Sequence, residues 1–131
     1  MDSKGIKLSQ VSKNRIDTII GHIEHYVPKD TRPFVIKLSL MHGIENHSIS
    51  SELPTELSSS AWEMGSIING NDYLLAKHLI INELQKEIDD EKIIRDHMKR
   101  FIELGVKDIA SLLESDDAIF EEEFLIKLLS V

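Results

Sequence analysis

The 131-residue chain contains no cysteine and only three prolines. The lack of cysteine excludes a disulfide scaffold, a zinc site built from thiolates and a cysteine nucleophile. No apolar run approaches the roughly 18 residues that a membrane-spanning helix needs. Residues 1–5 open no apolar segment of the kind that begins a secretory signal. These absences together predict a cytoplasmic protein.

The six glycines stand apart from one another, so the sequence has no glycine-rich phosphate loop. The serines at 58–60 lack the Gly-x-Ser-x-Gly pattern of a nucleophile elbow, and residues 69–72 lack the rest of an EF-hand loop. Carboxylates are abundant, but amphipathic helices would place them on solvated faces, where nothing tunes them for acid–base catalysis. We therefore expect neither an enzyme nor a bound cofactor or metal.

The chain is rich enough in apolar residues for a core, since 41% are hydrophobic and 29% are charged. Its length fits one domain, and this composition excludes disorder throughout. We expect a single helical domain over residues 1–131, in which residues 1–8 could be a disordered N-terminal segment.

Apolar residues recur at helical spacing from the start of the chain. Residues 9–27 predict an amphipathic helix that Ser9 or Ser12 caps and Pro28 ends. Asp30 is the expected cap of a second helix, with a proline in its first turn.

The run at residues 34–41 fits two patterns, because its apolar residues alternate like a strand and also form a helical stripe. A lone strand would have no partner, since no second alternating run exists, so we favour a helix. Residues 45–54 are polar and rich in serine, and predict a loop.

Two further helices are expected in the middle of the chain. Thr55 is a suitable cap for a short helix that carries Trp62 and ends at Asn69-Gly70. Asn71 or Asp72 would cap the next, whose inward side chains are expected to be Leu74, Leu75, Leu79, Ile81, Leu84 and Ile88.

A later apolar stripe of Ile94, Met98, Phe101 and Ile102 leads to Gly105. Residues 89–91 either join this stripe to the preceding helix or break the two apart, so 72–104 is one helix or two. We expect the helix to end at Gly105, a short helix over 106–114 to follow, and a last helix to start after Ser115. The fold class is therefore all-α, a single compact bundle of about six or seven helices.

Negative charge is concentrated in the second part of the chain. The net charge is −8 overall, with residues 1–50 slightly basic and residues 51–131 strongly acidic. The larger acidic patch consists of Glu114, Asp116, Asp117, Glu121, Glu122 and Glu123. The secondary acidic patch consists of Glu83, Glu87, Asp89, Asp90 and Glu91. Such a surface repels phosphate backbones and attracts basic proteins, although a charge run can also be a solvated face that only aids solubility.

These features favour a non-enzymatic inhibitor of the immunity-protein or antitoxin type, which would neutralise a basic bacterial toxin such as a nuclease by covering its active-site surface. Trp62 is a candidate aromatic anchor for the partner, or closes the edge of the core. The alternative is a helical adaptor or regulatory subunit that uses surplus apolar residues on the helix that begins near Asp72. The sequence identifies neither the partner nor the oligomeric state, monomer or homodimer.

Two weaker signals point elsewhere. His22 and His25 share one helix face, and His42 and His47 could approach them, but no zinc-ligand motif is present. The segment 98–129 has the spacing of a helix-turn-helix, yet its carboxylates would oppose phosphate, so it predicts a generic helical hairpin. We expect no metal, no nucleic acid and no membrane as partners.

Overall fold

The computed structural model describes residues 6–25, 28–48, 57, 62–63, 68, 70–84 and 90–115. Within these residues the chain forms four helices and one short antiparallel ladder. The elements in order are β1 (Lys7–Leu8), α1 (Gln10–Ile23), α2 (Thr31–Asn46), β2 (Trp62–Glu63), α3 (Gly70–Leu84) and α4 (Glu91–Ser115). The expected all-α bundle is confirmed, but the described residues form four helices rather than the expected six or seven.

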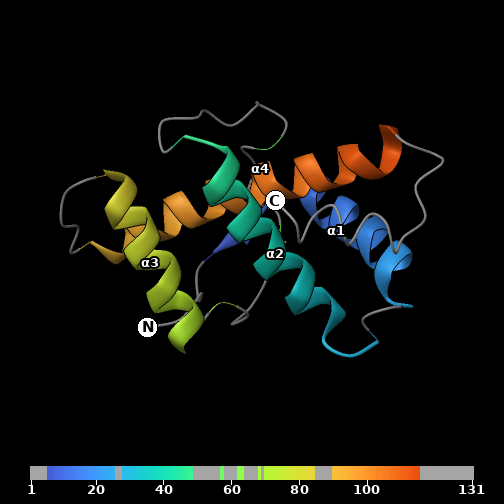
Figure 1. Cartoon of the computed structure of the whole chain (residues 1–131), viewed down its shortest axis with the longest axis horizontal. Coiled ribbons are helices and arrows are strands. Elements are labelled where there is room, and N and C mark those ends of the chain that lie inside the picture. The colour runs from blue at the N-terminus through green and yellow to red at the C-terminus, as the bar shows by residue number, and fades with distance from the viewer. Residues whose placement is uncertain are drawn as a thin grey trace.

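The longest helix, α4, runs along the length of the molecule, and the other helices pack around it. Figure 1 shows α2 crossing α4, with α1 and α3 on opposite sides of this crossing. The predicted stripe of Ile94, Met98, Phe101 and Ile102 is fully buried, so this part of the core is confirmed.

The crossing of α2 and α4 brings the two backbones into contact at glycine. A Cβ atom added to Gly105 would overlap the carbonyl oxygen of Ser39, and one added to Gly43 would overlap that of Phe101. Gly105 therefore permits close packing rather than ending a helix, and α4 continues through it to Ser115. The predicted break at Gly105, with a separate helix over 106–114, is wrong, and with it the helical hairpin.

The first two helices follow the sequence signals at their starts more closely than at their ends. Ser9 caps α1 as expected, because its side chain accepts a hydrogen bond from the backbone N–H of Ser12. The helix ends at Ile23 rather than at residue 27, well ahead of Pro28. Asp30 precedes α2 in a left-handed conformation and makes no side-chain capping bond.

The helix favoured over residues 34–41 is confirmed as part of α2. The helix continues beyond the expected loop boundary at Glu45, because Ile44 is buried and the backbone N–H of His47 still bonds the carbonyl of Gly43. The loop prediction is therefore wrong for Glu45 and Asn46, while residues 49–54 lie outside the described residues.

Trp62 lies in β2 and not in a helix, which corrects the sequence prediction. Leu8 pairs with Trp62 and Lys7 with Glu63 in an antiparallel register. This ladder joins segments that are more than 50 residues apart in the sequence. The spacing of apolar residues within 55–68 therefore does not predict it. Ile6 and Leu8 are buried, so the described part of the N-terminal segment contributes to the core.

Residues 72–104 belong to two helices and not to one, because α3 ends at Leu84 and Asp90 lies outside any helix before α4 begins. The side-chain carboxylate of Asp90 accepts a hydrogen bond from the backbone N–H of Lys92. The backbone carbonyl of Asp90 accepts a second hydrogen bond, from the backbone N–H of Ile94. Asp90 therefore begins α4 as a cap.

The core side of α3 differs from the prediction. Tyr73, Ala76 and Ile80 are buried, whereas Leu74 and Leu75 are 52% and 53% exposed. The buried stripe of this helix runs through residues 73, 76 and 80. The inward assignment of Leu74 and Leu75 is therefore wrong.

The segment 116–131, with the predicted last helix, lies outside the described residues, as do residues 1–5. None of the helices that the structure describes is both long enough and apolar enough to cross a bilayer.

Candidate functional site

The larger acidic patch falls almost entirely outside the described residues. Its one member in a described element is Glu114, in the last turn of α4. The other members, Asp116, Asp117, Glu121, Glu122 and Glu123, follow α4 in the chain. The role predicted for this patch stays a prediction.

The secondary acidic patch divides between exposed and internally paired carboxylates. Glu83 is exposed near the end of α3. The Asp90 carboxylate caps α4, and the Glu91 carboxylate lies 2.9 Å from the ammonium of Lys77. Glu87 and Asp89 are outside the described residues. Asp90 and Glu91, two members of this patch, therefore stabilise the folded structure through contacts within the chain.

The described residues, taken together, are close to electrically neutral. They carry twelve basic and thirteen acidic side chains, whereas the rest of the chain carries three basic and ten acidic ones. The acidic excess of this protein therefore lies in the segments outside the described residues.

Trp62 is held by side chains of its own chain. It is partly buried against the core, and the cationic groups of Lys13 and Arg32 lie 6.0 and 5.6 Å from the centre of its ring. The Asp17 carboxylate pairs with both cations, at 3.3 Å from Lys13 and 2.7 Å from Arg32. This arrangement agrees with the edge-of-core alternative, and the anchor role stays a prediction.

The outer face of α3 carries two exposed leucines among polar side chains. Leu74 and Leu75 lie side by side in the chain, each more than half exposed. Around them, the exposed residues of α3 are Gly70, Asn71, Asp72, His78, Asn82 and Glu83. The sequence signal for this face was the excess of apolar residues over what one buried stripe needs.

Only one basic side chain lies on α3, and it turns toward α4. Lys77 is 24% exposed and its ammonium pairs with Glu91. At the other end of the helix, the carboxylate of Asp72 pairs with Lys37 of α2 at 2.8 Å, and both side chains remain well exposed. These two ion pairs link α3 to α4 and to α2.

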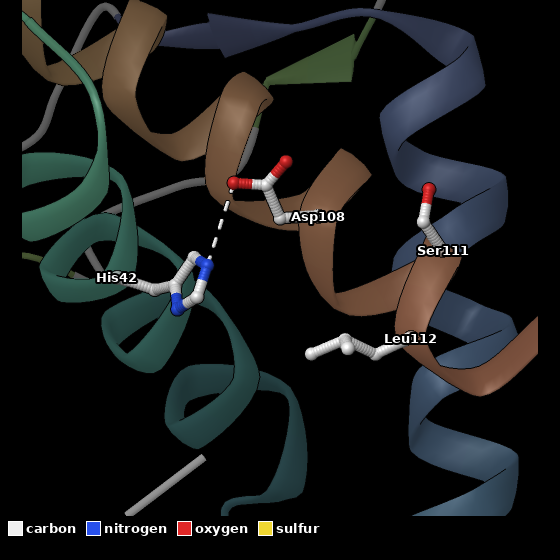
Figure 2. A pocket seen from close by; sticks show the side chains of 4 residues that line it. All are labelled: His42, Asp108, Ser111 and Leu112. Carbon is white, nitrogen blue, oxygen red and sulfur yellow. Dashed lines mark ion pairs between the residues drawn. The ribbon is translucent and has the colours of Figure 1, made fainter. Parts of the chain in front are cut away.

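A second group of polar residues gathers where α2 ends against α4. One oxygen of Asp108 lies 2.6 Å from Nε2 of His47 and 3.4 Å from Nε2 of His42. Figure 2 shows His42 and Asp108 facing each other beside a hollow of about 360 Å³, to which Ser111 and Leu112 also contribute. Sequence reasoning missed Asp108, because nothing local marks it as a partner of residues in α2.

His42 makes a contact through each of its two ring nitrogens. The side-chain amide of Asn46 lies 3.4 Å from Nδ1 of His42, and Nε2 of His42 faces Asp108. In Figure 2 the hydroxyl of Ser111 points away from His42. The cluster therefore ties the end of α2 to α4.

The histidine pair predicted on the first helix lies at the end of α1 and in the turn that follows it. His22 and His25 are exposed on and just after α1. Among the described residues, no three His, Asp or Glu side chains form a set that could hold a metal ion. No protein-family model, curated protein or solved structure matches this chain. What the protein does is therefore inferred from its own residues.

Proposed function

We propose that this chain is a non-enzymatic binding protein that docks another protein through the outer face of α3. This adaptor function rests on one observation, the exposure of Leu74 and Leu75 to 52% and 53%. Adjacent exposed leucines on a helix whose opposite stripe is buried are typical of an interaction surface. Single exposed apolar residues are common, but two of the three large apolar side chains that are exposed among the described residues lie in this one helix.

A photo-crosslinking amino acid at position 75, expressed in the host cell, tests this proposal. The same amino acid at the exposed Asn14 of α1 serves as the matched control. We expect a discrete adduct with another protein at position 75, which the Leu74→Ser change weakens, and no such adduct at position 14. Absence of an adduct at position 75, or equal adducts at both positions, would contradict the proposal.

The charge distribution supports a second candidate, the inhibitor of a basic protein such as a toxic nuclease. The supporting observation is that residues 114–123 contain six acidic side chains and no lysine or arginine. In this function, the carboxylates occupy positions that phosphates take on the basic partner. Its association rate should fall steeply with salt, whereas docking through leucines alone should be almost insensitive to salt.

A further inference from the structure

We draw no further inference here: the strongest candidate, the hollow beside His42 and Asp108 where α2 ends against α4, carries nothing because the imidazole and the carboxylate that line it already pair with each other and nothing among the described residues shows what would occupy it.

Discussion

The buried carboxylate of Glu103 accepts hydrogen bonds from both the backbone N–H and the hydroxyl of Ser9, each at 2.7 Å. The hydroxyl of Ser12 also donates to it, and the ammonium of Lys99 lies 3.4 Å away. Because Glu103 is fully buried, these donors replace the water that a carboxylate needs. The positive end of α1 thus docks on the middle of α4.

Glu103→Gln should lower the free energy of unfolding by about 1–3 kcal/mol, because the amide cannot accept every hydrogen bond that the carboxylate accepts. Glu103→Ala should cost about 3–5 kcal/mol, since it also leaves the serine donors unpaired. Urea unfolding measures both. Glu24→Gln on the exposed surface is the control and should change stability by less than about 0.5 kcal/mol. Equal values for the two glutamine variants would show that the Glu103 network is not stabilising.

Gly105→Ala should destabilise the protein by about 1–3 kcal/mol or more, because the added methyl overlaps the backbone of α2 at Ser39. Gly21→Ala in α1 is the matched control, since nothing lies within 4 Å of its new Cβ. That change should stabilise by about 0.5–1 kcal/mol through helix propensity. Thermal unfolding distinguishes the two directions. A stabilising Gly105→Ala would contradict the close crossing of α2 and α4.

Arg32→Met should cost about 0.5–1 kcal/mol, because Trp62 loses a cation above its ring and Asp17 loses a partner. Trp62 is the sole tryptophan, so the fluorescence of the protein reports this site alone. We expect its emission to shift in Arg32→Met and to stay unchanged in Lys29→Met, where the lysine is exposed. The same emission in both variants would mean that Arg32 does not contact the ring in solution.

His97 should titrate below the ordinary value of 6.5. Partial burial lowers the pKa of His97, the charge of Arg100 lowers it further, and Asp96 opposes this shift. The unfolded chain therefore binds the proton more readily, so the contribution of His97 to stability is fully present above about pH 6.5 and is lost as the pH falls below that value and through the lower pKa of the folded protein. His97→Gln should flatten this part of the stability–pH curve.

Nuclear magnetic resonance of the ring protons of His97 measures the same shift directly. Arg100→Gln should raise the pKa of His97, because it removes the second cause of the lowering. A midpoint at or above 6.5 in the parent protein would contradict the partial burial seen in the structure.

Local spacing predicted the parts of the fold that depend on near neighbours in the chain. The helix over 34–41, the Ser9 cap and the stripe from Ile94 to Ile102 are of this kind. In each case, the periodicity or the cap lies within a few residues, so the sequence contains the signal.

Features that join distant segments could not be predicted in this way. Trp62 lies in a strand because it pairs with Leu8, and Asp108 matters because His42 and His47 arrive from α2. Neither relationship leaves a pattern in the residues beside it.

By itself, the sequence determined that the chain is helical, that thiol chemistry is absent and that acidic residues dominate its second part. Only the tertiary structure decided that Gly105 lies inside a helix and that Leu74 and Leu75 face outward. Composition and the helical periodicity of apolar residues are properties of the sequence alone. The role of a glycine or a leucine depends on which other part of the folded chain packs against it.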